Sequence, residues 1–307
     1  EISTSNGHVL QLGVDDDVIY EIPNGKERTT ENLRNEFIRI CSEIRKKGGL
    51  PQVNHPFDVS FSTRYNSEFW DMVEIFESIE IWNGATPFAA GTINAKAFKK
   101  WLSLLDEGKR LTATTGSDTH NIYGDDYFGM TEWLDWLMDI VMKHPEIYPV
   151  QMNENVAYLT WLYKKVWPRL LSWVEQSNTP STIHNYVYTN GKNQPQEILQ
   201  AIREGHSFIS NGPLVTAEVN GASYGEKAVL KDRTGTLSVH VFSKKLINHL
   251  WMYTGADKKV ELCAKADAAE GGFTYDIVTD EFDFGDAAWA LFVADGGENN
   301  LAISNPI

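Results

Sequence analysis

The sequence predicts an α/β domain with a parallel sheet or barrel over residues 1–211, followed by an antiparallel β-sandwich over residues 212–307. Three successive helix–strand patterns in the first 120 residues indicate the α/β domain. Short β-rich runs that glycine, aspartate and asparagine interrupt indicate the sandwich. The length of 307 residues agrees with two domains, because a domain has about 150 residues on average.

Each helix–strand pattern consists of apolar residues at helical spacing, a short apolar strand and a polar segment. In the first pattern, Thr29 and Thr30 can cap a helix that ends at Gly48 and Gly49. We expect the strands at residues 50–53, 79–82 and 111–115. The segments after them are Asn54-His55-Pro56, Asn83-Gly84 and Gly116-Ser117-Asp118-Thr119-His120. Because ligands bind outside the carboxyl ends of parallel strands, these segments predict a functional site.

A helical insertion is expected at about residues 130–178, between the third pattern and the rest of the domain. Half of the chain's 10 tryptophans lie in it, among apolar residues at helical spacing. We interpret them as the core of a helical hairpin, and the alternative is an apolar lid beside the site. After the insertion we expect strands at 186–188 and 208–209, separated by a helix that ends at Gly205. The predicted sandwich strands are 237–242, 273–278 and 289–293.

The charge of the chain excludes several classes of partner. It has 27 Lys and Arg residues against 42 Asp and Glu residues, a formal net charge of −15. Since nucleic-acid binders normally carry a basic surface, neither nucleic acid nor an anionic membrane is an expected partner. The sequence has no apolar run of about 18 residues that would predict a membrane span. Cys41 and Cys263 form no metal-binding motif and leave the compartment open.

Two of the polar segments carry residues that bind metal ions in proteins. Asp118 and His120 stand two residues apart just after a strand, a spacing that can serve neighbouring metal ions. Pro56 favours an extended backbone at His55, which directs this side chain beyond the strand. The alternatives are an aspartate that caps a turn and a histidine in an exposed loop.

Three further residues are weaker candidates. Glu80 lies inside an apolar strand, where a carboxylate needs a partner, so a metal-binding or supporting role is favoured. Glu1 and His8 are more typical of a solvated terminus and a surface histidine. The sequence has no phosphate-binding glycine loop and no Gly-x-Ser-x-Gly motif. Metal-assisted hydrolysis is the chemistry that remains.

Several stretches in order along the chain resemble the PHP (polymerase and histidinol phosphatase) superfamily, most closely its carbaryl-hydrolase (CehA/McbA) branch. The matching stretches are Glu1 with Gly7-His8 and Leu12-Gly13, Asn54-His55-Pro56, Ile79-Glu80-Ile81-Trp82-Asn83-Gly84, Ser117-Asp118-Thr119-His120, residues 201–208, Asn211-Gly212-Pro213, and Ser304-Asn305-Pro306-Ile307. They span nearly the whole chain apart from residues 130–178.

The resemblance implies a distorted seven-stranded β/α barrel that holds two or three divalent ions of zinc, manganese or iron. The implied metal ligands are Glu1 as the bridging carboxylate, His8, His55, Asp118 and His120. Residues that would support the ligands from outside are Glu80, Asn83 and His206, the last at a position where the family pattern has arginine. Members of this branch are often exported, which favours a periplasmic or exported protein.

The family pattern opens with a strand that carries His-x-His, and this sequence begins at Glu1 without it. We therefore expect that an N-terminal segment was removed, that another chain supplies it, or that the site is degenerate. The first barrel strands would then be missing as well.

The function predicted for the intact protein is a metal-dependent hydrolase of a small-molecule ester. A phosphoesterase that uses a metal-bound hydroxide is the first interpretation, and a carbamate or carboxyl-ester hydrolase is the alternative. A non-catalytic binding protein on a degenerate fold is the third, and a regulatory module of a polymerase is disfavoured by the acidic charge. The sequence does not indicate an oligomeric state.

Overall fold

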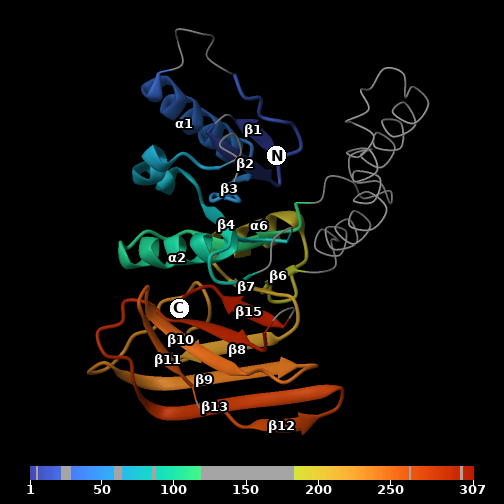
Figure 1. Ribbon diagram of the computed structural model, residues 1–307, viewed down its shortest axis with the longest axis vertical. Helices are drawn as coiled ribbons and strands as arrows, with labels where there is room; N and C mark the ends of the chain where they lie inside the picture. Colours follow the sequence, from blue (N-terminus) through green and yellow to red (C-terminus); the bar gives the residue numbers. More distant parts are fainter. Residues whose placement is uncertain are drawn as a thin grey trace, which may run out of the picture. The chain divides into compact units, whose positions relative to one another are not determined.

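The computed structural model describes residues 1–4, 6–21, 29–58, 64–84, 88–118, 183–262, 264–297 and 300–307. The chain divides into two compact units, one of residues 1–116 with 183–307 and one of residues 117–182. All the helices and strands described below belong to the first unit (Figure 1). The predicted tryptophan-rich insertion and His120 lie outside the described residues.

The first sheet has five strands in the order β1-β2-β3-β4-β5. Their bounds are β1 (Ile2–Thr4), β2 (Gly7–Leu12), β3 (Leu50–Asn54), β4 (Ser78–Asn83) and β5 (Thr112–Gly116). β1, β2 and β3 pair antiparallel, whereas β3, β4 and β5 run parallel. The three predicted helix–strand patterns are confirmed: α1 (Thr30–Lys46) precedes β3, the 3-10 helix η2 (Ser67–Ile75) precedes β4, and α2 (Ile93–Asp106) precedes β5.

The predicted β/α barrel is wrong. The described residues form three sheets and only four helices, and no closed barrel is found among them. A parallel barrel needs helix–strand units that repeat all the way round. Here β2 runs antiparallel to β3 on one side of the sheet. On the other side, β6 (His184–Val187) pairs antiparallel with β7 (Ser207–Ser210) in a different sheet.

Local sequence determines where the helices begin and end. The Thr29 side chain caps α1 by accepting a hydrogen bond from the Asn32 backbone N–H, as the sequence predicted. The Thr92 side chain caps α2 in the same way. α6 (Pro195–Glu204) has proline in its first turn and Gly205 in the left-handed conformation at its end. The buried face of α1 is made of apolar residues at helical spacing, among them Phe37, Ile40, Cys41 and Ile44.

The remaining strands form an antiparallel sandwich, which confirms the sheet-rich part of the prediction. One sheet has six strands in the order β11-β10-β14-β15-β7-β6, and the other has four in the order β12-β13-β9-β8. The new strands are β8 (Leu214–Val219), β9 (Thr234–Ser243), β10 (His249–Gly255), β11 (Lys258–Glu261), β12 (Ala266–Ala269), β13 (Gly272–Asp283), β14 (Leu291–Asp295) and β15 (Leu301–Ser304). β8 and β9 alternate buried and exposed residues, because only one face of their sheet is covered. The six-stranded sheet includes β6 and β7, which precede the boundary predicted at residue 211.

The six-stranded sheet is covered on both faces. On one face, Phe292 and Ala294 of β14 belong to the sandwich core. On the other, Leu291 and Val293 belong to the core that the first sheet and its helices form. This double burial explains the continuous apolar run in β14, which a strand with one wet face would not show.

Two asparagine side chains cover the outer edge of β5. The Asn305 amide accepts a hydrogen bond from the Ala113 N–H (2.7 Å) and donates one to the Ala113 carbonyl (3.2 Å). The Asn185 amide forms the same pair of bonds with Thr115, at 2.9 and 2.8 Å. Each side chain thus replaces one residue of a neighbouring strand, and together they join the first sheet to the six-stranded sheet without a ladder.

Replacing Asn305 with alanine should lower the free energy of unfolding by about 3 kcal/mol, because the buried N–H and C=O of Ala113 would lose their partners. The Asn185→Ala change should cost under about 1 kcal/mol, since Asn185 is exposed and water can replace its amide. Urea unfolding followed by circular dichroism measures both. Equal losses from the two variants would contradict this account of the edge.

Candidate metal centre

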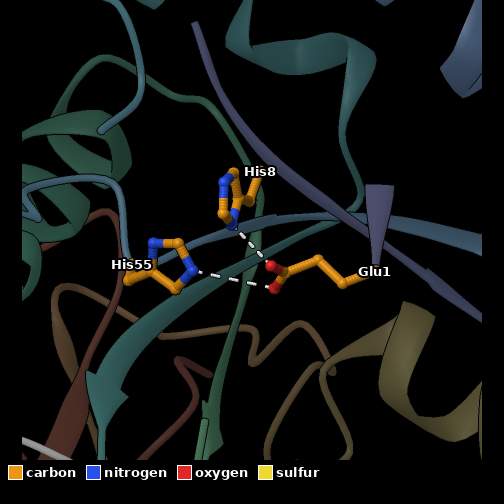
Figure 2. Close-up of side chains that lie close together, drawn as sticks. All are labelled: Glu1, His8 and His55. Atoms are coloured by element: carbon orange, nitrogen blue, oxygen red, sulfur yellow. Dashed lines mark ion pairs between the residues drawn. The ribbon is translucent and has the colours of Figure 1, made fainter. Parts of the chain in front are cut away.

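Three of the predicted ligands meet at one end of the first sheet. Glu1 precedes β1, His8 lies on β2 and His55 follows β3 directly. The register places His8 beside Ser3 of β1 on one side and beside Asn54 of β3 on the other. Figure 2 shows both imidazole rings facing the Glu1 carboxylate.

The turn between β1 and β2 requires glycine. Gly7 has φ of 127°, a conformation that residues with a side chain rarely adopt. A Cβ atom at this position would lie 2.9 Å from the Tyr65 Cα atom. The glycine therefore lets β2 begin next to Tyr65, and His8 follows as the next residue.

The three ligands lie close enough together to reach a single ion after small shifts. His8 Nδ1 lies 2.5 Å from Glu1 Oε1, and His55 Nε2 lies 3.7 Å from Glu1 Oε2. One ligand atom from each residue can be chosen so that all lie within 4.8 Å of one another. In a tetrahedral site with bonds of about 2.0–2.2 Å, two ligand atoms lie about 3.3–3.6 Å apart. Binding of an ion would therefore move His8 Nδ1 and Glu1 Oε1 apart and shorten the widest separation. No other group of this kind occurs among the residues that the structure describes.

The cluster is buried on the histidine side and open at the carboxylate. The exposed fractions of the side chains are 4% for His55, 13% for His8 and 24% for Glu1. His8 Nδ1 is buried and contacts the Glu1 carboxylate, so this nitrogen and the carboxylate oxygen already face each other as two ligands of one ion would. The open side leaves room for a further ligand, as catalytic metal sites do.

Glu1 is ionised despite its burial. Burial raises the pKa of the Glu1 carboxyl, but the contacts with His55 and His8 and a hydrogen bond from Asn54 outweigh it. The pKa of Glu1 therefore lies well below its usual range. The cluster offers one negative oxygen ligand and two nitrogen ligands, a set that suits zinc, manganese or iron.

A chain of buried side chains holds the carboxylate in place across the sheet. The Asn54 amide donates to Glu1 Oε2, and the Gln52 amide donates to Asn54 Oδ1 at 2.8 Å. Gln52 Oε1 in turn accepts hydrogen bonds from the hydroxyls of Ser78 on β4 (3.0 Å) and Thr114 on β5 (2.8 Å). Such second interactions fix the orientation of metal ligands and tune their affinity.

Two carboxylates hold His55 from outside the cluster. Glu80 on β4 is 3% exposed, and its Oε2 accepts a hydrogen bond from the His55 backbone N–H. This contact fixes the backbone of His55, whose φ is 24°. His55 Nδ1, the ring nitrogen on the side away from Glu1, lies 3.8 Å from Asp58 Oδ2. A carboxylate near the second nitrogen of a histidine ligand is a common feature of zinc sites.

The other predicted site residues do not belong to this group among the described residues. Asp118 follows β5 in the second compact unit with φ of 55°, and His120 lies outside the described residues. Asn83 is buried at the end of β4, where its backbone N–H and C=O bond to the Asn94 side chain of α2. His206 precedes β7, with its Nδ1 atom 3.7 Å from Glu204 Oε2. The structure thus brings three of the five predicted ligands together.

The supporting residues Gln52, Ser78 and Thr114 were missed from the sequence. Gln52 and Ser78 read as single polar residues beside apolar ones, and Thr114 reads as one of three threonines in its strand. The available indication of this polar network was Gln52 itself, which stands between Leu50 and Val53 and two residues before Asn54. A buried amide needs hydrogen-bond partners.

Comparisons with known proteins assign no function to this cluster. No protein-family model matches the chain, and no curated protein or solved structure matches it. Among the described helices, none is long and apolar enough to cross a membrane. The functional argument therefore rests on the residues and their geometry.

The chain should bind one equivalent of Zn²⁺ at this cluster. At a free zinc concentration of about 100 times Kd, the ion should stabilise the fold by about 2.7 kcal/mol. His55→Ala removes a ligand and should abolish both effects. His240→Ala removes an exposed histidine of β9 and should leave them unchanged. Calorimetric titration and thermal unfolding measure the two effects. Equal zinc binding by the two variants would contradict the assignment.

Gln52→Leu should weaken zinc binding about tenfold without removing a ligand, because Asn54 loses the partner that orients it toward Glu1. Thr114→Val keeps the shape of the side chain and removes one hydrogen bond to Gln52, so its effect should be smaller. Gln200→Leu on the exposed side of α6 is the matched control. If Gln52→Leu bound zinc with the affinity of the control, the hydrogen bonds from Gln52 would have no role in holding the site.

Proposed function

We propose that the protein is a metal-dependent hydrolase of small-molecule esters, with phosphoesters as the first substrate class. The single observation that carries the proposal is the convergence of Glu1, His8 and His55 into one cluster with an open side. A divalent ion held there would activate water and polarise the bond to be broken. The ordered sequence motifs that resemble PHP metallohydrolases support the same chemistry.

The residues of the chain have distinct roles in this proposal. Glu1, His8 and His55 hold the ion, and Asn54 keeps the carboxylate turned toward the two imidazoles. Glu80 fixes the backbone of His55. The histidines are shielded from water, whereas the Glu1 side is accessible, so substrate approaches from there.

Charge favours an anionic substrate. A divalent ion with one carboxylate ligand and two neutral imidazoles keeps a net charge of about +1. Positive charge at the reacting centre attracts a phosphoester and stabilises the charge that develops on its oxygens.

The ligand set also favours a second candidate, a carboxyl-ester or carbamate hydrolase. Two histidines and one glutamate around a single zinc ion is the arrangement of zinc enzymes that cleave acyl bonds. The two candidates differ in substrate and share the cluster, so one assay separates them.

Zinc-loaded and manganese-loaded protein should hydrolyse at least one of p-nitrophenyl phosphate, bis(p-nitrophenyl) phosphate, p-nitrophenyl acetate and an aryl carbamate. His55→Ala should lower the rate about 100-fold or more, since the activated water is lost. The His240→Ala control should keep it. Faster turnover of the phosphates supports the phosphoesterase, and faster turnover of the acetate or carbamate supports the second candidate. A protein that binds the metal and leaves all four intact would be a binding protein, and the proposal would be wrong.

A further inference from the structure

Two adjoining cavities lie where β5 begins, at the other end of this strand from the Asp118 segment. The larger measures about 700 Å³ and is formed by the α2–β5 connection, the end of α6 and the residues before Ile307. The smaller measures about 210 Å³. They share Arg110, Ala288, Trp289 and Ile307 in their walls. Neither cavity is lined by Glu1, His8 or His55, so they are separate from the metal cluster.

The larger cavity is cationic in an otherwise acidic chain. Lys109, Arg110 and Arg203 line it together with His206, and Glu204 is the only acidic residue among its described lining residues. The described lining side chains carry a formal charge of 3 − 1 = +2 with histidine neutral, whereas the whole chain carries −15. Two of the three cations have carboxylate partners outside the lining. A cavity of this sign draws small anions from solution.

Among the three described cations that line the larger cavity, Arg110 is the unpaired one. Lys109 is paired with Glu107 (3.1 Å), and Arg203 is paired with Glu77 (2.7 Å). Arg110, in contrast, makes no ion pair or side-chain hydrogen bond within the part of the chain that the structure describes. It lies in the shared wall, so a group bound to it touches both cavities.

The smaller cavity combines an apolar wall with two cationic residues, Arg110 and Lys227. Its lining includes Val219, Leu230 and Phe284 from the sandwich core, with Trp289 in the shared wall. An apolar cavity of about 150 Å³ can hold a benzene molecule. The volume of about 210 Å³ therefore has room for a phenyl ring or a short alkyl chain.

Gly225 keeps the wall of the larger cavity in place. Its φ is 79°, and a Cβ atom there would lie 2.0 Å from the Glu204 carbonyl oxygen and 2.7 Å from His206 Cδ2. Only glycine allows this turn to lie against the end of α6, so the cavity wall depends on it.

We propose that the two cavities together bind an amphipathic organic monoanion, a carboxylate attached to a short alkyl or aryl group. The carboxylate pairs with the guanidinium of Arg110, whose planar donors match two carboxylate oxygens. The apolar group enters the smaller cavity and packs against Trp289 and Phe284.

Calorimetric titration of the full chain with hexanoate and 3-phenylpropanoate tests the proposal. Hexanamide is the control probe without the charge, and inorganic phosphate is the control probe without the apolar group. At least one carboxylate should bind with one-to-one stoichiometry and about tenfold more tightly than either control probe. Arg110→Gln should weaken that binding about tenfold or more. Ala288→Trp, which fills the junction from an exposed position, should abolish it. Lys244→Gln removes an exposed cation outside both cavities and should change nothing.

Four results would contradict the proposal, each in a different way. The absence of saturable binding by either carboxylate would overturn the proposal. Equal affinity for hexanamide would show an apolar cavity only, and equal affinity for phosphate would show an unspecific anion site. Equal effects of Arg110→Gln and Lys244→Gln would show that net charge, and not Arg110, determines binding. Thermal unfolding shows whether each variant is folded. If Ala288→Trp is unfolded, Arg110→Gln alone decides the outcome.

Discussion

The candidate metal centre depends on one constraint: the Glu1 carboxylate is partly buried, and a buried charge needs partners. Two imidazoles and the Asn54 amide supply them, and Gln52 connects Asn54 to hydroxyls on β4 and β5. The ligands come from three consecutive neighbours of the sheet, so they meet only when β1, β2 and β3 are paired. Pairing of these strands therefore brings the three side chains of the candidate metal centre together.

The edge of β5 sets the form of the rest of the unit. An open edge exposes backbone donors and acceptors that must be satisfied. Asn185 and Asn305 satisfy them with side-chain amides. In a closed barrel, a further parallel strand would form these hydrogen bonds instead. Asn305 also lines the cationic cavity, so the residue that closes the sheet edge contributes to the second proposed site.

Periodicity in the sequence predicted the helix–strand patterns and the sandwich, because apolar spacing directly reports which faces are buried. It could not predict the direction in which β2 and β3 pair, because a long connection that contains α1 separates the two strands. Asn185 carried no signal in the sequence, and Asn305 belonged to a matching stretch without an assigned role, since the role of each depends on a strand that is far away in the sequence. Of the three proposed metal ligands, His55 was expected from its place after a strand, whereas Glu1 and His8 were favoured by the family resemblance alone. The residues that hold them, above all Gln52, carry no motif.

X-ray absorption at the zinc edge of the zinc-loaded chain tests the metal centre most directly. The geometry predicts scattering from two imidazoles and from carboxylate and water oxygens at about 2.0–2.2 Å. His8→Ala should remove the contribution of one imidazole and leave the other. A first shell of water oxygens alone, or a spectrum that His8→Ala does not change, would show that Glu1, His8 and His55 do not bind the ion.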